Sequence, residues 1–266
     1  MLGIDLTGRR ALITGSSSGL GRAMAEAFAE AGAKVAVHYR SPDDHADQAA
    51  AEAIAAAITQ AGGKAQAFAA DISRAEEVES LFQAIDTDFG GLDVLVNNAG
   101  MDGTRALCSE GKIQDWEAVV RVDLFGAYYC ARQALQRMNR QKHGVIINIT
   151  SVHEFIPWEG YSAYASAKAG LSMFTKTLAQ ETADAGIRVL AIAPGAIQTP
   201  INKSVWDNPQ TLQDLDKKIA MGRLGTPREI ASVAAFLASD LASYMTGTTV
   251  AVDGGMLIYP DFRQGG

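Results

Sequence analysis

A tyrosine and a lysine, four positions apart in the segment YASAK, are the residues of this chain best suited to proton transfer. If this segment is helical, Tyr164 and Lys168 lie on one face, one turn apart. Tyrosine is normally a poor acid or base near neutral pH, because its pKa is about 10. A neighbouring ammonium favours the phenolate, so the pair can exchange a proton with an alcohol or carbonyl oxygen.

A serine hydroxyl is available to the same chemistry upstream of this pair. Ser151 follows an apolar run at residues 145–149 that is typical of a strand. We expect it to orient a substrate oxygen and to stabilise developing charge by hydrogen bonding. Tyr161 also lies nearby, but it precedes Lys168 by seven positions rather than four, and we do not expect it to take part.

A glycine-rich segment near the N-terminus, TGSSSGLG at residues 14–21, predicts a phosphate-binding turn. It follows the apolar run 11–13 and opens an alanine-rich helical stretch at 22–31. Glycines permit a tight turn and close approach to a pyrophosphate, and a helix N-terminus offers free N–H groups. Alone, the motif could be a purely structural turn; together with YASAK it favours a dinucleotide site. The predicted contacts are Gly15, Ser17, Ser18, Gly19, Leu20 and Gly21.

Together these motifs resemble the short-chain dehydrogenase/reductase family along essentially the whole chain. Further matching segments are Asp71 after a predicted strand, NNAG at 97–100 and PGAIQT at 194–199. Within the family the chain most resembles bacterial glucose 1-dehydrogenases. Four segments carry this narrower resemblance: HYRS (38–41), SVHEFIPW (151–158), PGAIQTPIN (194–202) and DGGMLIYPDF (253–262). This resemblance implies NAD(P)-dependent oxidation of an aldose, foremost D-glucose, at its anomeric hydroxyl to a lactone.

Apolar runs alternate with helical stretches along the chain, which predicts an α/β fold. The expected strands are residues 11–13, 35–39, 65–69, 94–97, 145–149, 189–193 and 249–252. Most are apolar on both faces, as in a parallel sheet covered by helices on both sides. We expect one doubly wound Rossmann-type domain over 1–266, with a cofactor half at about 1–145 and a catalytic and substrate half at about 146–266. Ligands then lie outside the carboxyl ends of the strands.

Composition excludes several other functions. A net charge of −7, from 23 basic and 30 acidic residues, offers no basic face for nucleic acid. No apolar run approaches the ~20 residues of a membrane span, and residues 1–20 lack a signal-peptide core, so we expect a cytoplasmic protein. Cys108 and Cys130 are too few for a disulfide framework and are expected to be buried and inert. The spacing of possible ligands predicts no metal site.

The end of the second expected strand bears on the choice of cofactor. Dinucleotide enzymes usually place an acid there for the 2′-hydroxyl, whereas this chain has Tyr39 followed by Arg40. The Arg40 guanidinium can clamp a 2′-phosphate, so we expect NADP to be accepted; an ordinary surface charge is the alternative. Ser18 stands where strongly NADP-dependent relatives often carry a second basic residue, which favours use of NAD as well. Asp43 and Asp44 are expected at a helix N-terminus.

The family resemblance implies the remaining cofactor contacts. Asp71 and Ile72 match the adenine contact, with capping of the next helix as the alternative for Asp71. Segment 97–100 matches the part that steadies the central sheet and touches the adenosine ribose, and 194–199 matches the stretch that holds the nicotinamide carboxamide. Tyr164 and Lys168 are implied to contact the cofactor too, with Lys168 holding the nicotinamide ribose. The contacts implied in these two segments are Asn98, Ala99, Gly100, Pro194, Gly195, Ile197 and Thr199.

One residue departs from the family pattern. In WEAVVRVDLFGAYY the family usually has asparagine where this chain has Asp123, a position linked to a water chain feeding the lysine. An aspartate keeps acceptor capacity, loses the amide donor and adds negative charge. If the backbone carbonyl makes the key contact, little changes; if the side chain does, charged Lys168 is favoured. The resemblance thus groups Asp123 with the catalytic residues Ser151, Tyr164 and Lys168.

A sugar substrate requires several directional polar groups, because unpaired buried partners reject the wrong sugar. The resemblance implies Asp102 and His153 near the sugar, with a packing role as the alternative for His153. Asp102 stands where a glutamate is expected, which leaves the identity of the sugar open. Glu154 and Asn202 are further candidates, while Ser151 and Tyr164 would contact the reacting hydroxyl. Residues 201–216 are expected to form a mobile substrate flap.

Two other functions remain open at this point. A reductase of ketones or 3-oxoacyl carriers would need a basic patch for an acidic carrier, and Arg137, Arg140 and Lys142 make only a small one. A non-catalytic dinucleotide sensor would usually lack the tyrosine or the lysine. The resemblance also implies a homotetramer, paired through helices at about 113–139 and 161–185, with the apolar tail 256–262 as an interface segment.

Overall fold

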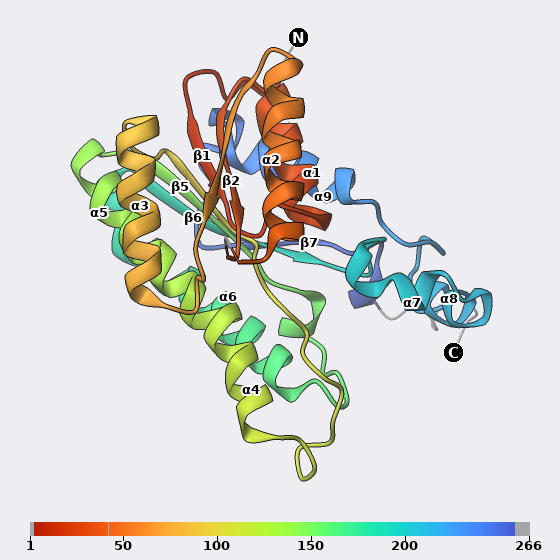
Figure 1. The fold of residues 1–266 in the computed structure, drawn as a ribbon. Helices are drawn as coiled ribbons and strands as arrows, with labels where there is room; N and C mark the ends of the chain where they lie inside the picture. The colour runs from red at the N-terminus through yellow and green to blue at the C-terminus, as the bar shows by residue number, and fades with distance from the viewer. Residues whose placement is uncertain (1–2, 42, 259–266) are drawn as a thin grey trace.

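Seven parallel strands form the central layer of the molecule (Figure 1). The computed structural model describes residues 3–41 and 43–258. The strands lie in the order β3-β2-β1-β4-β5-β6-β7, the arrangement expected of a doubly wound sheet. Each of the seven predicted strands falls within one of them: β1 (Arg10–Ile13), β2 (Lys34–Tyr39), β3 (Lys64–Ala69), β4 (Val94–Asn97), β5 (Gly144–Ile149), β6 (Ile187–Pro194) and β7 (Thr249–Val252).

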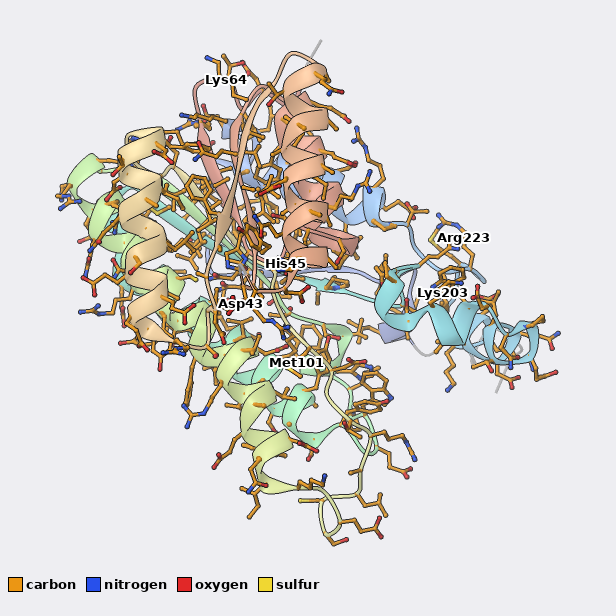
Figure 2. The ribbon with its side chains drawn as sticks, in the orientation of Figure 1. Asp43, His45, Lys64, Met101, Lys203 and Arg223 are labelled. Atoms are coloured by element: carbon orange, nitrogen blue, oxygen red, sulfur yellow. The ribbon has the colours of Figure 1, made fainter. Side chains whose placement is uncertain are left out.

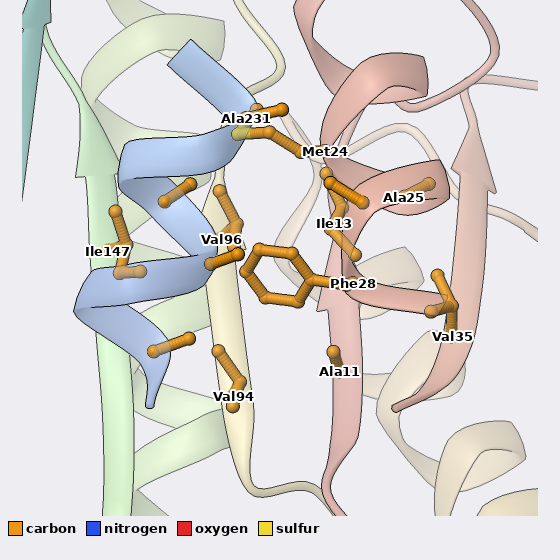
Figure 3. Close-up of a cluster of buried hydrophobic side chains, with 14 of the residues drawn as sticks. Ala11, Ile13, Met24, Ala25, Phe28, Val35, Val94, Val96, Ile147 and Ala231 are labelled. Atoms are coloured by element: carbon orange, nitrogen blue, oxygen red, sulfur yellow. The ribbon is translucent and has the colours of Figure 1, made fainter. Parts of the chain in front are cut away.

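Both faces of the sheet are buried, which explains the apolar runs. Ile13 and Val96 point to one face, where Phe28 packs against them (Figure 3), while Leu12 and Leu95 point to the other. This alternation follows from the two-residue period of a strand. The first face is covered by α1 (Gly19–Glu30), α2 (His45–Gln60) and α9 (Pro227–Ala238), and the second by α3 (Ala75–Phe89), α5 (Ala127–Gln141) and α6 (Ser162–Thr182).

The helix predicted at 113–139 is interrupted by a wider turn. It consists of α4 (Ile113–Val120), a π-helical segment η1 (Arg121–Gly126) and α5. Such segments insert an extra residue into the helical turn and are frequent at functional sites. The second predicted pairing helix, at 161–185, corresponds to α6, which ends at Thr182 before the short turn η3 (Ala183–Ala185).

The segment predicted as a substrate flap is largely helical. After β6 come η4 (Pro200–Asn202), α7 (Lys203–Trp206) and α8 (Pro209–Asp216), which extend away from the sheet beyond its carboxyl end (Figure 1). The remaining short turns are η2 (Val152–Glu154), η5 (Asp240–Ala242) and η6 (Met256–Ile258). Of the predicted interface tail 256–262, residues 259–262 lie outside the described residues.

The two cysteines differ in their surroundings. Cys130 on α5 is buried, and burial raises the pKa of its thiol to about 12, which keeps it protonated and unreactive. Cys108 is exposed, so the expectation that both thiols are buried is wrong for this one. It lies in the loop between β4 and α4.

Candidate active site

The predicted chemical residues gather where the central strands end. Gly15 follows β1, Asn98 follows β4, Ser151 follows β5, and Gly195 follows β6. Since the strands are parallel and adjacent, these turns meet at one edge of the sheet. Met101, labelled in Figure 2, lies in the connection that leaves this edge from β4.

Tyr164 and Lys168 occupy the helix that the sequence predicts. Both lie in α6, and the ammonium Nζ of Lys168 is 5.4 Å from the centre of the Tyr164 ring. Lys168 is buried, and its Nζ donates a hydrogen bond to the carbonyl oxygen of Ile149 at 3.1 Å. This bond ties the cation to the end of β5, two residues before Ser151. Ser151 is itself buried, and its Oγ accepts from the backbone N–H of His153 at 3.2 Å.

Asp123 contacts Lys168 through its side chain. Its Oδ2 lies 3.0 Å from Nζ of Lys168, and its Oδ1 accepts a hydrogen bond from the Met101 N–H at 2.8 Å. Gly100 completes the fit, because a Cβ at this position would lie 2.8 Å from Oδ2 and 3.2 Å from Nζ. Of the two alternatives left open by the sequence, the structure therefore has the side-chain contact.

Burial and ion pairing act together on the ionisation of this pair. Burial raises the pKa of Asp123, and the nearby ammonium and the Met101 N–H only partly oppose this. Burial by itself would lower the pKa of Lys168, but the Asp123 carboxylate more than compensates and raises it. The lysine therefore keeps its charge beside Tyr164. Asp123 faces it from the π-helical segment η1, whose wider turn was not predicted.

The glycine-rich turn is shaped so that only glycine fits at two positions. Gly15 has a φ of 62°, and a Cβ there would lie 2.9 Å from the Cα of Ala99. At Gly21 a Cβ would lie 2.2 Å from the carbonyl oxygen of Gly15, so helix and turn touch directly. Helix α1 begins at Gly19, and its N-cap residue Ser18 makes no side-chain capping bond. Its first N–H groups thus remain available to an anion, which fits a pyrophosphate.

Neighbouring residues support this turn from below. The Asn98 side chain donates to the carbonyl oxygens of Thr14 and Gly15, at 2.8 and 3.1 Å. The hydroxyl oxygen of Thr14 accepts the N–H groups of Asn98 and Ala99. The side chain of Asn98 thus steadies the glycine-rich turn. Above the turn, a surface hollow is lined by Ser17, Ser18, Gly19, Arg22, Ala23, Glu26, Pro200 and Pro227.

The residues assigned to the adenosine end of a cofactor are partly free. The Arg40 side chain is exposed, and its guanidinium forms a long ion pair of 3.5 Å with the Asp44 carboxylate. Asp44 is the N-cap of α2, which confirms the predicted place of its charge. Asp71 accepts hydrogen bonds from the N–H and hydroxyl of Ser73. The N-cap of α3 is Arg74, so the alternative of Asp71 as helix cap is wrong.

The segment assigned to the nicotinamide end runs along the β6–β7 edge. Pro194 ends β6, and the Gly195 N–H donates to the carbonyl oxygen of Val252 at 3.1 Å. Ile197 is buried, whereas Thr199 is half-buried. Leu20 and Ile72 are the remaining predicted contacts. Leu20, at the start of α1, is half-buried and packs against the core, and Ile72, after β3, is buried.

Three of the four predicted sugar-binding side chains, those of Asn202, Glu154 and His153, make hydrogen bonds within the protein. Asn202 accepts both the N–H and the hydroxyl of Thr199 and donates to the carbonyl oxygen of Ile197. Glu154 accepts a hydrogen bond from the Ser172 hydroxyl at 2.8 Å. His153 lies 3.2 Å from the Ile156 carbonyl oxygen through Nδ1, and burial lowers its pKa. Asp102 is half-buried in the loop after β4.

A stack of three rings beside Tyr164 was not predicted. Trp158 lies between His153, at a ring distance of 4.5 Å, and Tyr161, at 3.9 Å, with both pairs nearly parallel. Trp158 also meets Tyr164 edge to face at 6.0 Å. The aromatic residues of SVHEFIPWEGYSAY were the available signal, but their spacing does not reveal that the rings meet. An ion pair of Arg105 with Glu159 links this stack to the loop before α4.

Comparison with known proteins assigns the family. A family model described as enoyl-(acyl carrier protein) reductase matches residues 15–257. The 3beta-hydroxysteroid dehydrogenase 1 of Eggerthella lenta is 47% identical over 262 residues, 98% of each chain. The chain belongs to the short-chain dehydrogenase/reductase family. Its parallel sheet and its Rossmann-type fold are those of an oxidoreductase of this family.

Two further members illustrate the range of the family near this chain. The glucose 1-dehydrogenase 2 of Bacillus subtilis is 42% identical over 257 residues, 96% of this chain and 97% of that protein. A crystal structure of a gluconate 5-dehydrogenase from Burkholderia cenocepacia, in complex with NADP and tartrate, has a TM-score of 0.90 and 33% identity. It covers 96% of this chain and 97% of that one. The names of these dehydrogenases thus give different substrates for one shared fold.

Two structural findings concern other kinds of site. Over residues 3–41 and 43–258, no three or more His, Cys, Asp and Glu side chains come together in a way that could hold a metal ion. Within the same residues, no helix has both the length and the apolar character needed to cross a membrane.

Proposed function

We propose that this short-chain dehydrogenase/reductase interconverts a secondary alcohol and its carbonyl compound, using Ser151, Tyr164 and Lys168. The observation that carries this proposal is the buried lysine cation, 5.4 Å from the Tyr164 ring and bonded to the strand end that precedes Ser151. A bound nicotinamide dinucleotide supplies or accepts the hydride. The protein side chains handle the proton and the oxygen atom.

In the oxidative direction, the Tyr164 phenolate removes the proton of the substrate hydroxyl. The Ser151 hydroxyl hydrogen-bonds the same oxygen and holds it against the phenol. Lys168 stabilises the phenolate by its charge, and Asp123 in turn holds the lysine charged and in place. In the reductive direction Tyr164 returns the proton to the carbonyl oxygen, so each direction moves one proton at one atom.

For the cofactor, we propose NADP with NAD as a second choice. The uncapped start of α1 and the Gly15–Gly21 contact leave room for a pyrophosphate and supply its donors. The guanidinium of Arg40 is exposed, and a 2′-phosphate could replace its 3.5 Å contact with Asp44; a lone Tyr39 could not balance the charge of that phosphate. The Burkholderia relative in complex with NADP supports this choice. Ser18, which adds no second positive charge, supports use of NAD.

For the substrate, we propose a hydroxyl carried on a ring, with two candidate classes. An aldose such as D-glucose is the candidate from sequence, and similarity to the Bacillus glucose dehydrogenase supports it. It would depend on Asp102 and on the Nε2 of His153, since Asn202, Glu154 and the Nδ1 of His153 are already bonded within the protein. Two remaining polar groups are few for a molecule with a hydroxyl on nearly every carbon.

An apolar alicyclic alcohol or ketone is the second candidate, and the geometry favours it. The stack of His153, Trp158 and Tyr161 forms a rigid aromatic wall that meets Tyr164. Exposed Phe155, in the same connection between β5 and α6, and exposed Met101, in the connection after β4, add apolar surface. Such a surface suits a flat hydrocarbon ring better than a hydrated polyol. Similarity to the Eggerthella hydroxysteroid dehydrogenase supports this class.

Two alternatives have less support. An acyl-carrier reductase would need a basic patch, yet of the three residues predicted to form one, Arg137 is buried and paired with Asp86 at 2.6 Å. A non-catalytic dinucleotide sensor would not require a charged lysine beside an intact tyrosine.

We also propose a cytoplasmic homotetramer. The cytoplasmic location is supported only by the composition and the two free cysteines.

The assembly is supported by exposed apolar side chains on the helices α4, η1, α5 and α6, namely Trp116, Phe125, Tyr128 and Met173. Sedimentation equilibrium of the purified protein tests the assembly.

The function is tested by a panel of alcohols, aldoses and ketones with NADP and NAD in both directions, following absorbance of the reduced nicotinamide. The panel includes D-glucose, a hydroxysteroid, a small acyclic alcohol and a 3-oxoacyl thioester. We expect turnover of ring alcohols with NADP, and a higher kcat/KM for the alicyclic compound than for glucose. Binding of NADPH without turnover of any member would support the sensor instead.

A further inference from the structure

A histidine beneath the glycine-rich turn links two segments of the proposed cofactor site. His38 lies in β2 and is buried. Its ring Nδ1 lies 2.9 Å from the backbone nitrogen of Gly15, and its Nε2 lies 3.0 Å from the carbonyl oxygen of Ala70. Gly15 begins the turn after β1, and Ala70 follows β3, directly before Asp71. One ring therefore spans the two turns on either side of its own strand.

The partners of the ring fix its protonation. The Gly15 N–H can only donate, so Nδ1 must be unprotonated to accept its hydrogen bond. The Ala70 carbonyl can only accept, so Nε2 must carry the proton. Burial lowers the pKa of His38 to about 4, although the carboxylates of Asp47 and Asp71 act in the opposite direction. The ring is thus neutral at physiological pH and keeps this tautomer.

The backbone of His38 holds the next residue of the same turn. Its N–H donates to the Ser16 hydroxyl oxygen at 2.9 Å, and its carbonyl accepts the Ser16 N–H at 2.9 Å. The Ser16 hydroxyl in turn donates to the carbonyl oxygen of Ile13 at 2.8 Å. Side chain and backbone of one residue therefore determine the positions of Gly15 and Ser16, where the chain leaves β1 with a positive φ.

We propose that His38 is a positioning residue for the dinucleotide, holding the glycine-rich turn at a fixed distance from the Ala70–Asp71 segment. The inference rests on the proposed function, in that both segments are taken to contact the cofactor. The hydrogen bond of the Gly15 N–H is the critical one. Without the histidine acceptor this N–H would have to find another partner, and the glycine-rich turn would shift from its position. The Ala70 bond anchors the other end of the ring.

Two substitutions separate the two ends of the ring. In His38→Asn an amide oxygen reaches about as far as Nδ1, so the acceptor for Gly15 is kept and the Ala70 bond is lost. In His38→Gln the amide nitrogen reaches about as far as Nε2, so the Ala70 bond is kept and the Gly15 acceptor is lost. His143→Gln is the matched control. His143 directly precedes β5 and so lies where the strands begin, whereas the proposed cofactor site lies where they end.

The measurement is calorimetric titration of each purified protein with NADPH, together with KM and kcat. We expect binding about tenfold weaker in His38→Gln, near that of the wild type in His38→Asn, and unchanged in His143→Gln. The KM for NADPH should rise more than kcat falls. Equal affinities in both His38 variants would overturn the inference, whether or not their stability differs, because a purely structural histidine predicts no such split.

The wild-type protein provides a test that does not depend on the variants folding. Histidine ¹⁵N NMR at neutral pH should show His38 as the neutral tautomer protonated at Nε2, with and without NADPH. A proton on Nδ1, or a doubly protonated ring, would overturn the inference. If the wild type does not bind NADPH at all, the proposed function fails instead, so the two failures can be told apart.

Discussion

Replacing Asp123 by asparagine tests the buried ion pair beside the catalytic tyrosine. The two charges lie 3.0 Å apart, and at an effective dielectric constant of about 20 their attraction is about 5.5 kcal/mol. Removing one partner of a buried pair typically costs about 3–5 kcal/mol, because the remaining charge stays in a poorly solvated place. An asparagine can keep the Met101 hydrogen bond and can still accept from the lysine. We therefore expect Asp123→Asn to lose about 3 kcal/mol of stability.

The same substitution should change the pH dependence of activity. Asp123 raises the pKa of Lys168, so the stability from the charged lysine is present below its ordinary pKa of 10.5 and is lost as pH rises through the folded value. Without the carboxylate, burial dominates and the pKa of Lys168 falls. The alkaline limb of the kcat profile should then move to lower pH, while Tyr164 still catalyses near neutrality.

Urea unfolding at neutral pH and the pH profile of kcat at saturating substrate provide the two readouts. Asp93→Asn is the matched control, since Asp93 is also buried and paired with a cation, Arg10 at 2.7 Å, but lies at the start of β4, away from the site. It should lower stability and leave the shape of the profile unchanged. If Asp123→Asn has the alkaline limb of the wild type, the carboxylate does not control the lysine and the reasoning is refuted.

Three further predictions concern the other parts of the site. The pKa of His38 is about 4 in the folded protein and 6.5 ordinarily, so as the pH falls the unfolded chain takes up this proton first. Lowering the pH from 6.5 to 4 should therefore remove about 3 kcal/mol of the free energy of unfolding of the wild type. Urea unfolding across this range should show the loss in the wild type and not in His38→Gln; equal slopes would contradict it. Gly21→Ala puts a Cβ 2.2 Å from the Gly15 carbonyl oxygen and should weaken NADPH binding at least tenfold by titration, unlike Gly111→Ala, where the contacts are ordinary. Trp158→Leu should lower kcat/KM for an alicyclic alcohol about tenfold but hardly change it for a small acyclic one. An equal loss for both would show that the aromatic stack does not select between these substrates.

Much of the fold follows from patterns that depend only on local spacing. The strands are apolar on both faces because both faces are covered, so each was visible as an apolar run. The Tyr164–Lys168 geometry was predictable because a spacing of four has one outcome on a helix. The capping role of Asp44 likewise follows from residue type and position.

The remaining features depend on choices between partners that spacing does not encode. The π-helical turn around Asp123 arises from backbone hydrogen bonding across one extra residue, which leaves no periodic signal. Asn202 is a suitable sugar ligand by type, yet its amide is bonded to Thr199 and Ile197. The stacking of Trp158 requires two bends of the chain after β5, and neither is evident from its aromatic residues alone.

The most direct test of the proposed chemistry is the rate of hydride transfer in a single turnover by Tyr164→Phe, with NADPH affinity measured on the same sample. Phenylalanine keeps the ring beside Lys168 and Trp158 but removes the only group proposed to move the proton. We expect a rate at least about 100-fold lower with NADPH affinity unchanged. A variant that transfers hydride at the wild-type rate would show that the proton moves by another route, and the catalytic role of Tyr164 would have to be abandoned.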